Sequence, residues 1–507
     1  MKKIRRRGRK ILSILLSMTM AAGMMLTGIT PGTNEVKAAS SLTSADFLKT
    51  NGTSIRKNYG NGEKVYLRGT NAGGWLVQEN WMNPTNAPDQ RTMMDTLANR
   101  FGTSTRDSLV AAYEDNYWTT QDFDNCAAMG MSVIRLPFTY MNLCDDNGNL
   151  KSNAWRRLDW FVSNCSSRGM YVILDMHGAF GSQNGMDHSG EVNDGKQLYY
   201  NQGNKNKTLN LWAKIAEHFK GNPAVAAYDI LNEPGIKAAA TYSLHWDFYN
   251  EIYKTIRSKD SNHIIIMESC WDADNLPRPS AYGWTNVAYE YHYYPWNYIS
   301  NSSGQASYTA GKVRDIANHN YGVPTFVGEF TCFDQEDAWR NTMSTYNQQG
   351  WHWTTWAYKV TGNSSWGIYN HSPQSVDIYN DSADTIRKKW SSVGTDKGWV
   401  NSKIYNVVKS YLPGTVTPGD SGNSDNSGSS DNSDNSGNSG SSHGVTFYEH
   451  SNYGGWAVTL GEGWYTCSQI EAAGIRNDQI TSVKVPAGYV VTLYEHDNYE
   501  GAQKVLT

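Results

Sequence analysis

One pattern recurs along most of this chain: an amphipathic helical stretch, a glycine or turn, and then a short apolar strand. In residues 152–174, helically spaced apolar residues end at Gly169 and are followed by the apolar run YVIL. The same cycle recurs in residues 209–231, 248–267 and 313–327. Because helices that alternate with buried strands are typical of parallel sheets, the pattern predicts an α/β fold.

Eight candidate strands follow this rule, and they favour a closed barrel over a doubly wound sheet. None of them is followed by the glycine-rich phosphate loop that would favour a nucleotide-binding sheet. The predicted strands span residues 65–69, 132–136, 171–174, 225–231, 263–267, 287–291, 324–327 and 351–356. We therefore predict a (β/α)8 TIM barrel over residues 40–412.

A change of composition separates the predicted barrel from the C-terminal part of the chain. Residues 419–442 contain only Gly, Ser, Asn and Asp. Such a segment cannot bury enough apolar surface to offset the entropy of ordering. We predict a flexible linker over residues 413–443 and a second body over residues 444–507.

The N-terminus is typical of an exported protein. Basic residues up to Lys10 precede a mostly apolar stretch over residues 11–26, and the sequence VKA follows at residues 36–38. The alternative, a membrane anchor, needs about 20 apolar residues, more than this stretch provides. We predict a signal peptide over residues 1–38, a secreted, extracellular protein and no membrane span.

The charge balance argues against nucleic-acid partners. The chain has 44 basic and 48 acidic residues, but residues 1–38 hold eight of the basic residues and one of the acidic residues. The remainder therefore carries 36 basic and 47 acidic residues, a net charge of −11. Nucleic-acid binders usually present a basic face. With only 18% charged residues but 19 Trp and 32 Tyr, the surface suits uncharged, hydroxyl-rich ligands.

The cysteine pattern predicts buried free thiols, with one disulfide as the alternative. No CxxC or metal-type spacing is present, and a barrel of this size needs no disulfide to be stable. The six cysteines are Cys126, Cys144, Cys165, Cys270, Cys332 and Cys467.

Polar residues gather where the predicted strands end. In a parallel barrel the carboxyl ends of all strands meet at one mouth, where catalytic groups lie. Burying Arg, His and Glu there costs several kcal/mol unless they are paired. The strand ends carry Arg135, His177, Asn232 with Glu233, His292 with Tyr294, and Glu329. Their convergence predicts a functional site at this mouth.

Two glutamates, Glu233 and Glu329, end nearly opposite strands. This arrangement suits two carboxylates on either side of a glycosidic bond, one as acid and one as nucleophile. A separation of about 5 to 5.5 Å would give retention of configuration, and about 6.5 to 9.5 Å would give inversion. Either glutamate alone is equally explained as a salt-bridged strand-end residue.

The ordered motifs resemble glycoside hydrolase family 5, the retaining barrel hydrolases that include cellulases, mannanases and exo-1,3-glucanases. The motifs IRLPF, DMHG, NEP, YHYY, VGEF and WTTWAYK occur in the family's order between about residues 47 and 412. The resemblance implies that Glu233 is the acid/base and Glu329 the nucleophile. It also implies that catalysis needs no cofactor and that the partner is a β-linked polysaccharide.

By the same resemblance, Arg135 and Tyr294 would keep Glu329 ionised and aimed, and Asn232 would bond the sugar 2-hydroxyl. A nearby Arg lowers the pKa of a carboxyl group. A partly buried Glu233 without such a partner is expected to stay protonated to higher pH.

The aromatic side chains of the motifs have implied roles in the cavity. His177 and His292 would line the mouth, and Trp356 would stack beneath the reacting sugar. The alternatives are core histidines and a tryptophan of the barrel core.

Two loops narrow the resemblance to the exo-1,3-glucanase branch. Residues 71–81 and 181–190 are similar to loops of that branch, in which the acidic residue matching Glu79 holds the hydroxyls of the terminal sugar. The aromatic clamp of that branch is not identified here. We therefore expect a secreted, retaining β-glycosidase acting on β-glucan, of the cellulase or β-1,3-glucanase type. The alternatives are a β-mannan hydrolase and a non-catalytic polysaccharide-binding protein.

The C-terminal part contains an internal repeat at residues 447–455 and 493–501. It resembles a βγ-crystallin-type module, a small all-β Greek-key domain. The second motif stops about halfway, which predicts a truncated module or one completed by a partner.

The sequence NDQITS at residues 477–482 matches the calcium signature of that module. The resemblance implies calcium bound by Asp478, Ser482 and Glu495, with a capped turn without metal as the alternative. It also suggests contact with a cell wall or polysaccharide through this module.

Overall fold

The computed structural model describes residues 41–412, except 236–241 and 270–271, and much of residues 445–506. Within the C-terminal part, the gaps are residues 461–464, 466–469, 472, 476–478, 487–490 and 497–499. The predicted signal peptide, the predicted linker, Cys270 and Cys467 lie outside the described residues.

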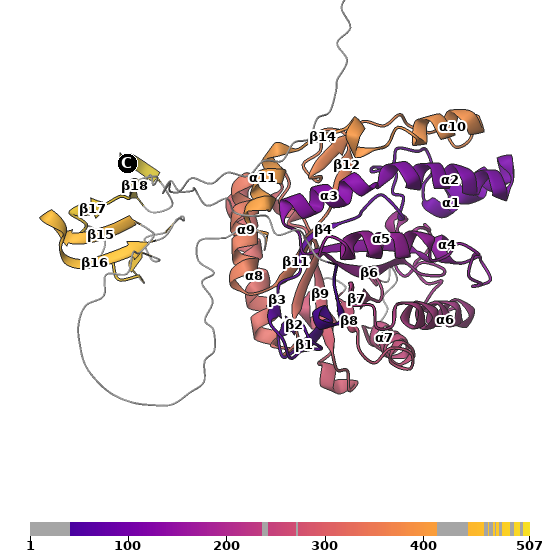
Figure 1. Cartoon of the computed structure of the whole chain (residues 1–507), viewed down its shortest axis with the longest axis horizontal. Helices are drawn as coiled ribbons and strands as arrows, with labels where there is room; N and C mark the ends of the chain where they lie inside the picture. Colours follow the sequence, from indigo (N-terminus) through magenta and orange to yellow (C-terminus); the bar gives the residue numbers. More distant parts are fainter. Residues whose placement is uncertain are drawn as a thin grey trace, which may run out of the picture. The chain divides into compact units, whose positions relative to one another are not determined.

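Eight parallel strands close into a barrel in the order β10-β11-β4-β5-β6-β7-β8-β9, which confirms the predicted fold (Figure 1). The barrel strands are β4 (Arg68–Asn71), β5 (Val133–Thr139), β6 (Tyr171–Gly178), β7 (Val225–Asp229), β8 (Ile264–Glu268), β9 (Val287–Tyr293), β10 (Thr325–Phe330) and β11 (His352–Thr355).

The start of the barrel differs from the prediction of one strand over residues 65–69. Lys64–Val65 instead forms β3 of a small antiparallel sheet with β1 (Lys49–Asn51) and β2 (Ser54–Arg56). Side-chain acceptors interrupt the strand ladder at this point: the Leu67 amide donates to Nδ1 of His352 over 3.0 Å. The Arg68 amide donates to the Ser132 hydroxyl over 2.9 Å. The barrel strand therefore begins at Arg68.

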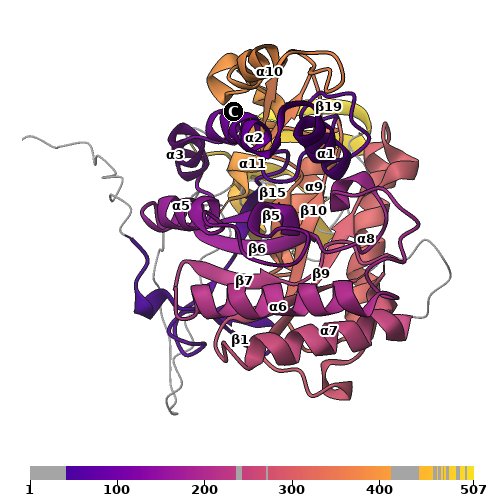
Figure 2. The ribbon, with the colours of Figure 1, turned by 90° about the vertical axis from the view of Figure 1, so that its right-hand side faces the viewer.

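Helices lie outside the strand ring (Figures 1 and 2). Helix α5, for example, buries the apolar face formed by Leu158, Phe161, Val162 and Cys165, as its spacing predicts. Between β8 and β9, the residues that the structure describes form only the short turns η3 (Ala273–Asn275) and η4 (Pro279–Ala281). The helices are α1 (Gln90–Phe101), α2 (Thr103–Tyr117), α3 (Thr120–Met129), α4 (Tyr140–Leu143), α5 (Arg156–Ser166), α6 (Gln202–Phe219), α7 (Tyr242–Arg257), α8 (Ser302–His319), α9 (Glu336–Gln348), α10 (Ala383–Trp390) and α11 (Ser402–Ser410).

The interior of the barrel is apolar at one end and polar at the other. Strand residues such as Val133, Ile173 and Ile264 form a buried apolar cluster with Leu48 and Ile55 of the small N-terminal segment. Towards the carboxyl ends of the strands, the buried residues include Arg135, Asp175, Asp229, Glu290 and Glu329. The packed end supports the fold, and the charged end is available for chemistry.

After the barrel strands, a second small sheet joins β12 (Lys359–Thr361), β13 (Tyr369–His371) and β14 (Trp399–Val400). The cysteines that the structure describes, Cys126, Cys144, Cys165 and Cys332, are buried free thiols. Among the described helices, none has the length and apolarity needed to cross a membrane.

The C-terminal part forms small antiparallel sheets, as the repeat predicts. Strands β15 (Val445–His450) and β16 (Gly454–Leu460) form one hairpin, and β18 (Val491–His496) and β19 (Glu500–Leu506) form another. Each hairpin has an irregular register after its tyrosine, Tyr448 or Tyr494. Strand β17 (Ser482–Lys484) pairs with β15.

Candidate active site

A cavity of about 620 Å³ opens at the carboxyl ends of the barrel strands. Its lining brings together seven residues that the sequence predicts for the site: Glu79, His177, Asn232, Glu233, Tyr294, Glu329 and Trp356. The other two, Arg135 and His292, contact Glu329 and Glu233 from within the barrel. The rest of the lining consists of Trp81, Asn184, Met186, His188, Gly235, Trp296 and Trp366.

Glu233 and Glu329 face the same gap. Glu233 follows β7, and Glu329 lies in β10. One carboxylate oxygen of each lies within 4.8 Å of the other and of a ring nitrogen of His292. The carboxylates are therefore close enough to act on opposite sides of one sugar.

Glu329 is held by two donors that do not lose their protons near neutral pH. Nη1 of Arg135 donates to Oε1 of Glu329 over 2.9 Å. The Tyr294 hydroxyl donates to Oε2 over 2.7 Å. Burial raises the pKa of Tyr294 well above its usual value, and the neighbouring Glu329 raises it further. Both contacts therefore hold the carboxylate oxygens of Glu329 in one fixed orientation.

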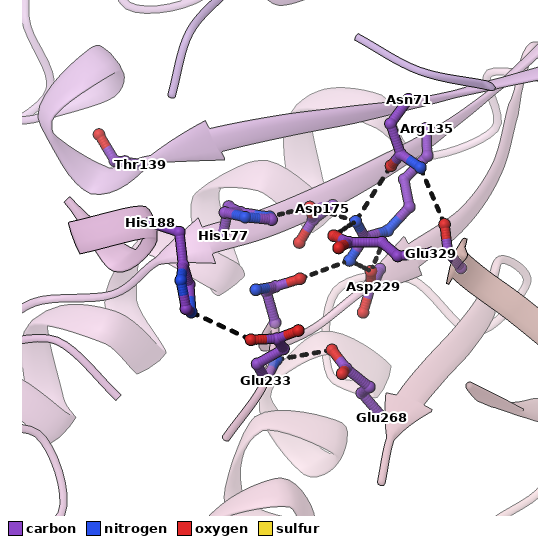
Figure 3. A network of polar contacts seen from close by, with 12 residues as sticks. Asn71, Arg135, Thr139, Asp175, His177, His188, Asp229, Glu233, Glu268 and Glu329 are labelled. Atoms are coloured by element: carbon purple, nitrogen blue, oxygen red, sulfur yellow. Dashed lines mark hydrogen bonds and ion pairs between the residues drawn. The ribbon is translucent and has the colours of Figure 1, made fainter. Parts of the chain in front are cut away.

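Arg135 is the centre of a buried charge network (Figure 3). Besides Glu329, its guanidinium contacts Asp229 at 2.7 Å, Asp175 at 3.1 Å and Glu290 at 3.2 Å. One cation does not neutralise four carboxylates, so some of these groups must carry protons. Consistent with this, burial raises the pKa of Asp175 to about 8 and that of Asp229 well above its usual value.

The backbone of Glu233 is held in an unusual conformation. Its φ angle is 40°, in the left-handed region that non-glycine residues rarely adopt. Its amide donates to Oε2 of Glu268 over 2.6 Å, and its carbonyl accepts from Nδ2 of Asn184 over 3.0 Å. These two contacts fix the peptide groups of Glu233 from β8 and from the loop after β6.

The carboxylate of Glu233 is paired with two histidines. Nδ1 of His292 lies 2.8 Å from Oε1, and Nε2 of His188 lies 3.1 Å from Oε2. Burial alone would raise the pKa of Glu233, but the two histidines outweigh it and lower this pKa well below the usual value. The expectation that Glu233 stays protonated to higher pH for lack of a cationic partner is therefore wrong.

Two buried polar atoms at the cavity have no hydrogen-bond partner in the described part of the chain. Oδ1 of Asn232 accepts from Arg135 over 2.9 Å, whereas its Nδ2 has no partner. Oε2 of Glu79 accepts from Trp81 over 2.8 Å, whereas its Oε1 has no partner. Buried polar groups are usually satisfied, so both atoms are suited to bind ligand hydroxyls. Burial raises the pKa of Glu79 to about 7.

Trp356 and His177 form one wall of the cavity. Their rings stack with centroids 5.4 Å apart and planes inclined by 8°. Nδ1 of His177 lies 2.7 Å from Asp175, and burial holds the pKa of this histidine well below its usual value. The peptide bond from Trp356 to Ala357 is cis. The His177 ring thus supports one face of the Trp356 ring.

Two groups of side chains within the described residues have ligand atoms close enough together for a cation: Glu233 with His292 and Glu329, and Glu268 with Glu290 and His292. Their atoms already bond to one another or to Arg135 and Tyr294. We therefore assign these side chains to proton chemistry.

Of the three predicted calcium ligands, Ser482 is the one whose side chain the structure describes. The Ser482 hydroxyl donates to the His450 carbonyl over 2.6 Å and accepts from the Tyr453 amide over 3.1 Å. Asp478 and the side chain of Glu495 lie outside the described residues. Ser482 therefore has a structural role in joining β17 to the hairpin.

Several residues of the site were not predicted from the sequence. Asp229 and Glu290 lie in otherwise apolar strands, with the sequences VAAYD and VAYEYHY. A buried charge inside such a strand is costly unless it is paired, so these two carboxylates could have been predicted from the sequence as members of a paired buried network. Glu268 ends the similarly apolar strand IIIME, whereas the loop residues His188 and Asn184 carry no comparable signal.

The fold and the site together define a barrel glycosidase. A model of the family described as "Cellulase (glycosyl hydrolase family 5)" matches residues 85–362, which is more than half of the chain. The chain belongs to glycoside hydrolase family 5 and is a glycoside hydrolase. Hydrolases of this family act on β-linked glycans and need no cofactor.

The chain is similar to a "Beta-xylosidase" of Phanerodontia chrysosporium, with 27% identity over 349 residues, 62% of this chain and 71% of the relative. It is 31% identical to a "Probable glucan 1,3-beta-glucosidase A" of Aspergillus fumigatus over 212 residues, 40% of this chain and 49% of the relative. The chain thus spans about half the length of this second relative. The crystal structure of rutinosidase from Aspergillus niger matches with a TM-score of 0.50 and 18% identity, covering 64% of this chain and 98% of that chain, and shows the shared fold.

Proposed function

We propose that the protein is a secreted, retaining β-glycosidase that hydrolyses β-glucan by a two-glutamate double displacement. The observation that carries this proposal is the pair of carboxylate oxygens within 4.8 Å of each other, each with a different kind of partner. This spacing suits direct attack by one carboxylate better than the wider gap of about 6.5 to 9.5 Å that admits a water molecule.

Glu329 is the nucleophile in this mechanism. Arg135 and Tyr294 hold its two oxygens in place, so that it attacks the anomeric carbon and forms a glycosyl-enzyme. Nδ2 of Asn232, which has no partner among the described residues, is placed to bond the 2-hydroxyl of the reacting sugar. Trp356 supplies an apolar face for the same sugar.

Glu233 is the acid/base. In the first step it protonates the leaving oxygen, and in the second it takes a proton from the water that hydrolyses the glycosyl-enzyme. Its hydrogen bonds to His292 and His188 suit this exchange, because a ring nitrogen of imidazole can either donate or accept a proton.

The proposed substrate is a β-glucan whose terminal sugar is bound at Glu79. The relatives named as glucan 1,3-beta-glucosidases support glucan as the substrate. Oε1 of Glu79, buried and without a partner among the described residues, supports recognition of sugar hydroxyls at this end of the cavity. The relative named as a beta-xylosidase makes a β-xyloside the second candidate.

The test is release of reducing sugar from laminarin, lichenan, cellulose, mannan and xylo-oligosaccharides. Wild-type protein should hydrolyse a β-glucan, and Glu329→Gln should be inactive on all of them while keeping its thermal unfolding. Glu336→Gln is the matched control, because Glu336 lies on the surface of α9, where its carboxylate forms an ion pair with Arg340. Binding of a glycan without hydrolysis by the wild type would instead identify a polysaccharide-binding protein.

Export and the C-terminal module complete the proposal. We propose that residues 1–38 direct secretion, which predicts that the protein recovered from culture medium begins near Ser40.

We also propose that the C-terminal module is of the βγ-crystallin type and binds calcium. A chelator should then lower the melting temperature of this part of the full chain, and an unchanged melting curve would contradict calcium binding.

A further inference from the structure

His188 contacts the acid/base Glu233 from a loop outside the barrel strands. It lies in the turn η2 (Asp187–Ser189), in the loop between β6 and α6. Its Nε2 lies 3.1 Å from Oε2 of Glu233, and the two side chains point toward each other in Figure 3. Only a fifth of the His188 side chain is exposed.

The loop that carries His188 is tied down by its own hydrogen bonds. The hydroxyls of Ser182 and Ser189 lie 2.5 Å apart, and the Gly185 amide donates to Ser182 over 2.7 Å. The Ser189 hydroxyl also donates to the Met186 carbonyl over 2.6 Å. The imidazole is therefore held beside Glu233 before any ligand binds.

Nε2 of His188 faces one acceptor and one donor. The acceptor is Oε2 of Glu233, and the donor is Nδ2 of Asn184 at 2.8 Å. The orientation of Asn184 is fixed, because the same Nδ2 donates to the Glu233 carbonyl and Oδ1 accepts from the Met186 amide over 2.9 Å. A protonated Nε2 therefore donates to Glu233, and an unprotonated Nε2 accepts from Asn184 or from a protonated Glu233. In the protonated state Asn184 loses Nε2 as an acceptor and keeps its hydrogen bond to the Glu233 carbonyl.

The charges around His188 are predominantly negative. Burial alone would lower the pKa of His188, but Glu233, followed by Glu79 and Glu329, raises it to about 9. The titratable groups that face it are Glu79 after β4, His177 on β6, Glu233 after β7, Glu329 on β10 and Asp187 beside it at 3.9 Å. His177 adds little positive charge, because burial holds its pKa well below the usual value.

Building on the proposed function, we propose that His188 and Glu233 share one proton, and that His188 supplies it to Glu233 for cleavage of the glycosidic bond. In the free enzyme the proton is on Nε2 and Glu233 is a carboxylate. A sugar that displaces water from the cavity favours the neutral pair over the ion pair, because both charges lose solvation. The N–H bond then breaks and an O–H bond forms on Oε2.

The proton returns to His188 within one turnover. Glu233 gives its proton to the leaving oxygen as the bond from this oxygen to the anomeric carbon breaks and Glu329 bonds to that carbon. In the second step Glu233 removes a proton from the attacking water, and this proton moves back to Nε2. Burial lowers the pKa of His292, but Glu268 and Glu329 raise it well above its usual value, so Glu233 shares its surroundings with two histidines that hold protons to high pH. The alkaline limit of activity is then set by Glu233 with both histidines, and removing His188 removes one of the two groups that hold the proton.

The test compares two substrates of the full-length His188→Gln and His188→Ala variants. Gln retains an amide donor but does not hold a titratable proton. On a β-linked oligosaccharide, both variants should lose kcat/KM at pH 8 by roughly 10- to 100-fold, and the alkaline limb should move down by about one pH unit or more. On a 2,4-dinitrophenyl β-glycoside, whose leaving group needs no proton, the loss should stay within about 3-fold.

His218→Gln is the matched control, because His218 lies on α6 and pairs with Asp159 at 2.7 Å away from the cavity. It should leave both substrates and both pH profiles unchanged. An unshifted alkaline limb in His188→Gln, or equal losses on the two substrates, would overturn the shared proton in favour of a pocket-shaping role. If His188→Gln does not fold, His188→Asn serves the same comparison. Wild-type protein inactive on every β-glycoside would instead contradict the proposed function.

Discussion

Glu233 and Glu329 share one cavity, but their hydrogen-bond partners differ in kind. Glu329 accepts from a guanidinium and a phenol, neither of which changes its protonation near neutral pH. Glu233 faces two imidazoles that do titrate, and nearby carboxylates outweigh burial and raise the pKa of His188 to about 9 and that of His292 well above its usual value. One carboxylate is thus held by donors that keep their own protons, whereas the other has partners with which it can exchange a proton.

The difference shows how one residue type obtains two roles. The partners of Glu329 come from β5 and from the end of β9, and Arg135 is fixed by further buried carboxylates. The partners of Glu233 come from β9 and from a surface loop, where His188 keeps some exposure to solvent. Rigid burial suits the nucleophile, and contact with solvent suits the group that must regain protons.

The largest effect is expected from Tyr294→Phe, which removes one fixed donor from Glu329 without adding bulk. Loss of one preorganised donor to a reacting oxygen lowers kcat by about 10²- to 10³-fold. Because the Tyr294 hydroxyl does not titrate near neutral pH, the pH profile should keep its shape. Steady-state kinetics across pH check this, and a shifted alkaline limb would remove the proposed distinction between the two glutamates.

A smaller effect is expected from Gly328→Ala, which disturbs both glutamates together. A Cβ added at Gly328 would overlap Oε1 of Glu290, the carboxylate that contacts both Arg135 and His292. Overpacking of this kind costs about 1–3 kcal/mol of unfolding free energy. Urea unfolding measures it. Gly311→Ala on α8 is the control, since a Cβ there would meet Nη2 of Arg314 at an ordinary contact distance of 3.9 Å and should leave stability unchanged or slightly higher.

The smallest effect is the pH dependence of stability that His188 contributes. Its pKa is raised to about 9 in the folded protein, so its stabilising contribution is complete below the unfolded value of 6.5 and is lost as the pH rises through about 9. We expect wild type to exceed His188→Gln by about 1–3 kcal/mol at pH 6 and to match it above pH 9. Urea unfolding at both pH values checks this, and a constant difference would contradict the raised pKa.

Much of the barrel could be predicted from the sequence, because its strands are short apolar runs between helices with clear periodicity. The strand-end residues Arg135, Asn232, Glu233 and Glu329 could be placed together because parallel strands of a closed barrel end at one mouth. The first strand was misplaced, since side-chain acceptors from His352 and Ser132 divide it in a way that no local pattern reveals.

The pairing inside the site was harder to predict. His188 lies in an irregular loop, and its contact with Glu233 joins residues 45 positions apart through tertiary structure alone. The expected protonation of Glu233 was therefore wrong, because the sequence pattern identifies strand-end partners but not those supplied by loops. In the C-terminal part, the repeat predicts the two hairpins because each contains its own turn.

The most direct test of the division between the two glutamates is the configuration of the product formed when azide rescues Glu329→Ala and Glu233→Ala. With a 2,4-dinitrophenyl β-glycoside, azide should occupy the space vacated by Glu329 and give the α-glycosyl azide. In Glu233→Ala, azide should attack the glycosyl-enzyme and give the β-glycosyl azide. The reverse pair of anomers would contradict the assignment of Glu329 as nucleophile and Glu233 as acid/base.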